Sequence, residues 1–125
     1  MKVVSRRQRR VAELIHEELG LLLERRVSDP RLAEVTITDV EITPDLKLAT
    51  VYFSVLDDEP ARVELALAGL EHARGFFRKS LAETLYLRFV PELRFRWDQS
   101  IRKGERIDRL LASLHEESPE PEEEE

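Results

Sequence analysis

The stretch from residue 62 to residue 97 constrains the fold more than any other part of the chain. Apolar side chains recur three and four residues apart over 62–73 and four residues apart over 76–86, which predicts two amphipathic helices. After the helix-stopping Pro91, apolar residues alternate with arginines over 92–97, which predicts a half-buried strand. The apolar side chains that we expect in the core are Val63, Ala66, Leu67, Leu70, Phe77, Leu81, Leu85, Leu93, Phe95 and Trp97.

The two predicted helices are separated by a break at Ala73, Arg74 and Gly75. Gly75 lacks a Cβ atom and can adopt backbone angles that strain other residues, so we expect the helix to stop or bend there. Arg74, Arg78 and Lys79 surround this break. Because helix N-termini also favour anions, the sequence predicts a polyanion site at this kink. A solvated helix face with local ion pairs is the alternative interpretation.

The other apolar patterns predict two more helices and two more strands. Ser5 is the expected N-cap of the first helix. The apolar phase of the first strand slips near Asp39, which indicates either a β-bulge or a strand covered on both faces. The expected buried stripe of the first helix is Val11, Leu14, Ile15, Leu19, Leu22 and Leu23. These further elements are a helix over 5–26, strands over 34–43 and 47–56, and a helix over 101–115.

Length and charge predict one folded domain with an acidic tail. The 125-residue chain is long enough to bury a core, and we assign residues 1–115 to a single domain. The formal net charge is −6, but seven glutamates lie among residues 116–125, and without them it is +1. That tail contains no apolar residue, so we expect it to be disordered. It could also fold back on a basic surface and compete with a polyanionic ligand there.

Composition argues against catalysis. The chain has no cysteine, which excludes disulfides, thiolate nucleophiles and cysteine-ligated zinc. His16, His72 and His115 lack metal-ligand spacing, and no carboxylate pair, Walker loop or nucleophile elbow stands out. We therefore expect neither an enzyme nor a bound metal or cofactor. No signal peptide or membrane-spanning stretch is visible either, so we expect a protein of the cytoplasm.

The order of the elements, α-β-β-α-break-α-β-α, indicates an α+β domain with helices packed on a small sheet. This order resembles the type II KH fold, which implies a mixed three-stranded sheet. From about Arg6 to Leu114 the sequence is similar to the ribosome-binding factor A family. The motifs that carry the resemblance are Asp29-Pro30-Arg31-Leu32, Val35-Thr36-Ile37-Thr38-Asp39-Val40-Glu41, Pro44-Asp45-Leu46, Ala49-Thr50-Val51-Tyr52, Ala73-Arg74-Gly75, Pro91-Glu92-Leu93-Arg94-Phe95 and Asp98-Gln99-Ser100-Ile101.

The resemblance implies a non-enzymatic assembly factor that binds the small ribosomal subunit and its rRNA. Its implied role is late maturation of the 5′ end of 16S rRNA, with a link to growth in the cold. We expect a monomer and leave open an assembly GTPase as a second partner. Ordinary KH domains clamp nucleic acid with a Gly-x-x-Gly loop. Here Gly69 and Gly75 are six residues apart, so that clamp is expected to be absent or altered.

The candidate RNA-binding residues are all cations. Besides the three at the kink, they fall into a basic N-terminal cluster, the arginines of the last strand, and one arginine between helix and strand. Each group could contact rRNA phosphates, or be a solvated or snorkelling surface. The full set is Arg6, Arg7, Arg9, Arg10, Arg74, Arg78, Lys79, Arg88, Arg94 and Arg96.

Two rival functions stay open from the sequence. A generic KH module would take free RNA as its ligand, although the missing Gly-x-x-Gly loop disfavours it. A protein-interaction adaptor would recognise ribosomal proteins or an assembly GTPase, and its basic residues would merely be solvated. Salt separates these functions, because a phosphate-driven complex weakens steeply as salt rises and an apolar protein contact does not.

Overall fold

The computed structural model describes residues 4–25, 28–57 and 59–99 of the chain. The predicted helix over 101–115 and the acidic tail over 116–125 lie outside these residues. The described elements are helix α1 (Arg6–Arg25), the short 3₁₀ helix η1 (Pro30–Leu32), strands β1 (Val35–Ile42) and β2 (Leu48–Val55), helices α2 (Pro60–His72) and α3 (Arg74–Leu85), and strand β3 (Glu92–Trp97).

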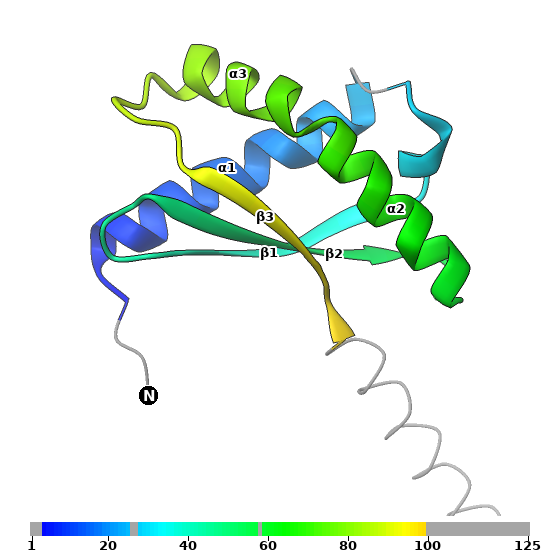
Figure 1. The fold of residues 1–125 in the computed structure, drawn as a ribbon. Helices are drawn as coiled ribbons and strands as arrows, with labels where there is room; N and C mark the ends of the chain where they lie inside the picture. Colours follow the sequence, from blue (N-terminus) through cyan, green and yellow to red (C-terminus); the bar gives the residue numbers. More distant parts are fainter. Residues whose placement is uncertain (1–3, 26–27, 58, 100–125) are drawn as a thin grey trace, which may run out of the picture.

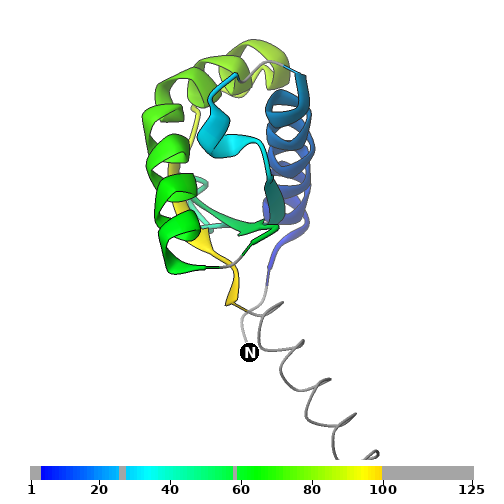
Figure 2. The same cartoon turned by 90° about the vertical axis from the view of Figure 1, so that its right-hand side faces the viewer.

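The three strands form one mixed sheet in the order β1-β2-β3. β1 and β2 are antiparallel, and β2 and β3 are parallel. The helices pack over one face of this sheet (Figure 1), and the turned view places α1 and α2 on either side with α3 across the top (Figure 2). This arrangement confirms the predicted α+β, KH-like order. The opposite face is not covered by any described helix.

The core lies between the sheet and the three helices. Val40, Val51 and Phe95 are paired across the strands and buried, and the Phe95 ring meets that of Phe77 edge-on at 6.1 Å between centroids. Phe77 is 1% exposed, so α3 is fixed to β3 through this pair. The expected core of α2, α3 and β3 is largely confirmed, although Val63, Leu67, Leu85 and Trp97 are only half-buried and pack against its edge.

Helix α1 begins with a reciprocal cap that confirms Ser5 as N-cap. The backbone nitrogen of Gln8 donates to Ser5 Oγ, and the backbone nitrogen of Ser5 donates to Gln8 Oε1, both at 3.0 Å. Gln8 Nε2 also donates to the Ile42 carbonyl at 2.9 Å, which ties the helix start to the end of β1.

The buried stripe of α1 is narrower than predicted. Leu14 and Leu23 were expected to be buried but are half-exposed. No described helix is long and apolar enough to cross a membrane.

The phase slip in β1 is a bulge. Ile37 pairs with Phe53 and Asp39 pairs with the next residue back along β2, Tyr52, so Thr38 is the extra residue. This irregularity switches the buried positions from Val35 and Ile37 to Val40 and Ile42. The first of the two sequence interpretations is therefore confirmed.

The break between α2 and α3 lies at Ala73, whose φ and ψ are −88° and 1°. Its amide donates to Gly69 and its carbonyl accepts from Phe77, both at 3.0 Å, so the backbone bends with its hydrogen bonds kept. The expected role of Gly75 in this break is wrong, because no described glycine has a positive φ and Gly75 already belongs to α3. The close approach is at Gly69, where an added Cβ would lie 3.0 Å from Leu32 Cδ2.

Candidate nucleic-acid interface

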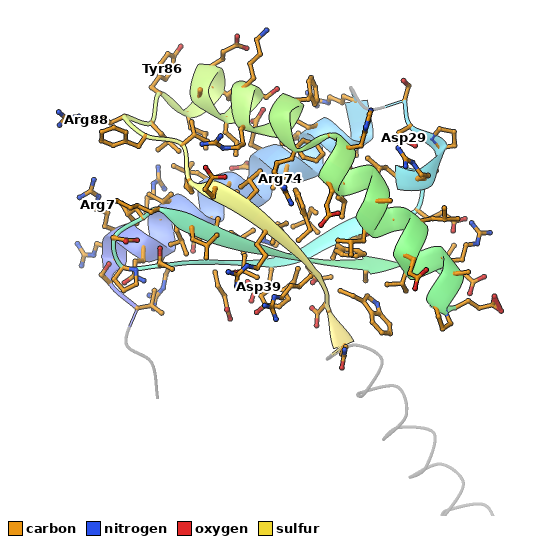
Figure 3. The ribbon with its side chains drawn as sticks, viewed as in Figure 1. Arg7, Asp29, Asp39, Arg74, Tyr86 and Arg88 are labelled. Atoms are coloured by element: carbon orange, nitrogen blue, oxygen red, sulfur yellow. The ribbon has the colours of Figure 1, made fainter. Side chains whose placement is uncertain are left out.

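Arg74 lies half-buried at the α2–α3 junction and points toward β3 (Figure 3). Its guanidinium carbon is 5.7 Å from the centre of the Phe95 ring, within cation–π range. Its Nη2 is 3.7 Å from Glu71 Oε2, and its buried Nε has no hydrogen-bond partner among the described residues. Arg74 therefore packs much of its side chain against the sheet.

Arg78 joins α3 to the segment that precedes β3. Its Nε donates to the Pro91 carbonyl at 3.1 Å and its Nη2 donates to the Val90 carbonyl at 2.9 Å. The same Nη2 is 3.7 Å from Glu92 Oε2. The four-residue spacing does place Arg74 and Arg78 on one helix face, but that face looks toward the protein. Of the predicted kink cations, only Lys79 is exposed.

The N-terminal arginines are exposed, and none forms an ion pair with another described residue. They do not form one surface. Arg9 lines a hollow of about 410 Å³ between α1 and β1, together with Glu13, Asp39 and Glu41. We call this the acidic hollow. Arg7 lines a different hollow, described below. The helix thus divides the predicted cluster between two electrostatic environments.

Arg94 and Arg96 lie exposed on the face of the sheet that no described helix covers. Arg96 pairs in register with Tyr52, which pairs in turn with Asp39. The Tyr52 hydroxyl donates to Glu41 Oε1 at 3.2 Å. Burial of the Tyr52 hydroxyl is the largest cause that raises the pKa of Tyr52. The Glu41 carboxylate raises this pKa further, whereas Arg96 lowers it. This face is therefore basic along β3 and acidic along β1, and not uniformly attractive to RNA.

A second hollow, of about 750 Å³, lies between the start of α1, the β1–β2 turn and the segment from α3 to β3. Arg7 and Arg88 both line it and lie toward the same end of the molecule (Figure 3). No sequence pattern linked these two residues, and sequence reasoning missed Lys47, which also lines the hollow. We call this the basic hollow. Its lining residues are Arg7, Val11, Asp45, Leu46, Lys47, Tyr86, Leu87, Arg88, Phe89 and Pro91.

His16 and Asp29, two other titratable residues, have structural partners. His16 Nε2 lies 2.9 Å from the Ile37 carbonyl, which joins α1 to β1. Asp29 caps η1 and binds the Arg31 guanidinium, with Oδ2 and Nη2 2.6 Å apart. The Arg31 hydrogen bonds lower the pKa of Asp29 to about 2. Within residues 4–25, 28–57 and 59–99, no cluster of histidine and acidic side chains could hold a metal ion.

Comparisons with known proteins agree on one family. A family model described as ribosome-binding factor A matches residues 7–111. The ribosome-binding factor A of Geobacter sulfurreducens is 45% identical over 108 residues, which are 86% of this chain and 91% of that protein. The crystal structure of the Thermus thermophilus factor has a TM-score of 0.63 at 25% identity, covering 71% of this chain and 93% of that one.

A further similarity concerns an assembled particle. Coordinates of a homology model of the Thermus thermophilus factor, fitted into a cryo-EM map of a 30S complex, match with a TM-score of 0.59. The match is 24% identical and covers 70% of this chain and 91% of that one. This chain thus shares its fold with a protein that has been placed on a 30S subunit.

Proposed function

Because the chain belongs to the ribosome-binding factor A family, we propose that it binds the small ribosomal subunit through the subunit's rRNA and assists its assembly. The single observation that carries this proposal is the family match over residues 7–111 of the 125-residue chain. The 30S complex of the Thermus thermophilus factor supports the small subunit as the partner.

The finer role is proposed from the family resemblance. In this proposal the factor acts in the cytoplasm, late in subunit maturation, on the 5′ end of 16S rRNA, and matters most for growth in the cold. It acts as a monomer through one domain over residues 1–115, and the acidic tail over 116–125 is not required for binding. An assembly GTPase is a second partner that fits the same role.

The proposed mechanism makes and breaks no covalent bond. A factor that binds one rRNA conformation more tightly than another raises the population of the first, and its differential affinity limits the effect. Cations supply the attraction, because each neutralised phosphate releases condensed counterions. Exposed members of the predicted set are the best placed to do this, namely Arg6, Arg7, Arg9, Arg10, Lys79, Arg88, Arg94 and Arg96.

Co-sedimentation tests the proposal directly. The full chain is spun with purified small subunits, large subunits or whole ribosomes over a salt series. We expect selective binding to small subunits. The logarithm of the binding constant should fall linearly with the logarithm of the salt concentration. Equal binding to all three particles would reduce the protein to a generic basic surface and contradict the proposal.

A protein-directed adaptor is the alternative function that the same experiment separates. Its binding would rest on apolar contacts and would change little with salt. Leu56 and Leu65 are exposed apolar side chains of the kind such a contact uses. Salt-independent binding that Leu56→Ser abolishes would favour the adaptor over the rRNA-directed factor.

A further inference from the structure

The basic hollow contains two aromatic side chains that the core does not use. Tyr86 is 87% exposed and Phe89 is 75% exposed, and both line the hollow. Single exposed apolar residues are common on protein surfaces. Two large aromatic rings in one hollow are a stronger signal, because burying either ring in the core would have stabilised the fold.

Cations surround these rings. The Arg88 guanidinium carbon lies 5.7 Å from the centre of the Phe89 ring, and Arg7 and Lys47 line the same hollow. The acid among the lining residues is Asp45, whose carboxylate already accepts from Thr43 Oγ1 and the Lys47 amide. Three cations therefore line the hollow against a single acid, and that acid is already hydrogen-bonded, so the hollow is positively charged. By contrast, the acidic hollow combines Arg9 with Glu13, Asp39 and Glu41.

The backbone around the basic hollow is also unusual. Leu46 has a φ of 62° and Tyr86 a φ of 53°, and they are the described non-glycine residues in the left-handed region. Both line this hollow. Such angles are costly for bulky residues and concentrate at functional sites. At Tyr86 the left-handed angle ends α3, where the ring is left almost fully exposed.

We propose that the basic hollow binds an unpaired nucleotide of rRNA, with its base stacked on Phe89 and its flanking phosphates held by Arg7, Lys47 and Arg88. The inference rests on the proposed function and names the kind of rRNA that the factor recognises. Stacking on aromatic rings within a positive groove is the chemistry of single-strand recognition. A base inside a duplex offers no free face to such a ring, so the target is a single-stranded segment.

Charge and size both favour this occupant over a peptide. Each nucleotide brings one flat base beside one phosphate, which matches the ring of Phe89 beside the cation of Arg88. An acidic peptide would pair with the cations but would leave the ring faces without a matching flat group. The volume of about 750 Å³ lies within the usual range of ligand pockets, roughly 300–1,000 Å³.

The test compares variants of the full chain for binding to small subunits at one salt concentration. Phe89→Leu keeps an apolar side chain but removes the ring, and we expect affinity to fall about tenfold. Tyr86→Phe keeps a ring and should bind like the parent. Phe76→Leu is the matched control, because Phe76 is an exposed aromatic residue of α3 that does not line the hollow. Thermal unfolding of each variant reports whether the fold is intact.

A second arm identifies the class of ligand. A fluorescein-labelled single-stranded RNA dodecamer and its duplex are titrated with each protein, and fluorescence anisotropy is measured. We expect preference for the single strand in the parent and loss of that preference in Phe89→Leu. Small-subunit binding that depends on Phe89, without any Phe89-dependent dodecamer binding, would assign the hollow to a ribosomal protein and overturn the inference.

The outcomes for the two proposals differ. Selective small-subunit binding that is equal in the parent and in Phe89→Leu would overturn the stacking site and leave the proposed function standing. Failure of the parent chain to select small subunits would overturn the proposed function itself. A loss of affinity shared by Phe89→Leu and the Phe76→Leu control would show a general effect of aromatic residues and would also overturn the site.

Discussion

Arginine occupies both the α2–α3 junction and the basic hollow, but its guanidinium group has different neighbours in the two regions. At the junction, Arg78 donates to two backbone carbonyls and Arg74 lies against the Phe95 ring. In the hollow, Arg7 and Arg88 form no ion pair with any described residue. Arg88 does contact a ring, that of Phe89, but this ring is exposed, whereas Phe95 is buried. The first pair is therefore held by buried parts of the fold, and the second is available to a ligand.

This difference shows what charge in a sequence can and cannot indicate. Arg74, Arg78 and Lys79 surround a helix break, which made them the leading candidates for phosphate contact. The carbonyls that accept from Arg78 belong to residues 90 and 91. Only the folded structure shows that these hydrogen bonds engage the Arg78 guanidinium. Arg7 and Arg88 are 81 positions apart in sequence, and the fold brings them to one hollow.

Replacing Arg78 should give the largest effect and should act on stability. Arg78→Ala removes two charged hydrogen bonds to partly buried carbonyls, and we expect the free energy of unfolding to fall by about 2–3 kcal/mol. Urea unfolding measures this. Lys79→Ala is the matched control, because Lys79 is the exposed neighbour on the same helix, and it should change stability by less than about 0.5 kcal/mol.

Arg78→Lys sharpens the same comparison. Lysine keeps the charge but cannot reproduce the planar fork that reaches two carbonyls. We therefore expect Arg78→Lys to lose most of the stability that Arg78→Ala loses. A lysine variant as stable as the parent would show that the carbonyl contacts contribute little and would return Arg78 to the set of free phosphate ligands.

The arginines of the basic hollow should show the reverse behaviour. In Arg7→Gln with Arg88→Gln, we expect small-subunit affinity to fall about tenfold and the log–log salt slope to lose about two units. Thermal unfolding should change little, because neither side chain forms an ion pair with a described residue and the ring that Arg88 contacts, Phe89, is itself exposed. Arg62→Gln is the control: Arg62 is an exposed arginine at the start of α2 and does not line this hollow. An unchanged salt slope would show that no phosphate is bound there.

Much of the fold could be predicted from apolar periodicity. Helices α1–α3 and the three strands lie within a few residues of their expected bounds, because apolar periodicity marks where each begins and ends. The bulge near Asp39 was one of two predicted alternatives, since a phase slip alone does not say whether the second face is covered. The reciprocal bonds of Ser5 and Gln8 were half-predicted, through the serine alone.

The candidate site was less predictable, for a physical reason. The exposed state of Tyr86 and Phe89 depends on a left-handed turn after α3, which no residue type at that position signals. Lys47 reaches the hollow only because the β1–β2 turn folds toward the start of α1. The basic Arg88 between the aromatic residues Tyr86 and Phe89 was the one local signal that could have indicated a nucleic-acid site.

Gly75 tests what sets the bend at the junction. Its angles are helical and an added Cβ would meet nothing within 4 Å, so Gly75→Ala should raise the free energy of unfolding by about 0.5 kcal/mol. Gly69→Ala is the contrasting variant, because its Cβ would lie 3.0–3.2 Å from Leu32 and Arg31 atoms. Thermal unfolding should rank Gly75→Ala above the parent. A destabilised Gly75→Ala would show that the glycine, and not packing around Ala73, sets the bend.

Arg31 is the intermediate case, engaged by the fold through a partner only two residues away. Its hydrogen bonds lower the pKa of Asp29 to about 2, below the value near 3.8 of an unpaired aspartate. A carboxyl whose pKa is lower in the folded state stabilises it above the unfolded pKa and loses that contribution as pH falls from about 4 to 2. Asp29→Asn keeps a capping oxygen for the Arg31 amide but removes the titration.

We therefore expect Asp29→Asn to be slightly less stable than the parent at pH 7, with the difference shrinking toward pH 2, as measured by urea unfolding at several pH values. The effect should be the smallest of this series, because the pair is partly exposed and therefore screened by solvent. A difference that stays constant from pH 7 to pH 2 would mean that the ion pair adds nothing beyond the cap. Engagement of an arginine by the fold would then depend on burial of its acceptors, as at Arg78, and not on a nearby acid.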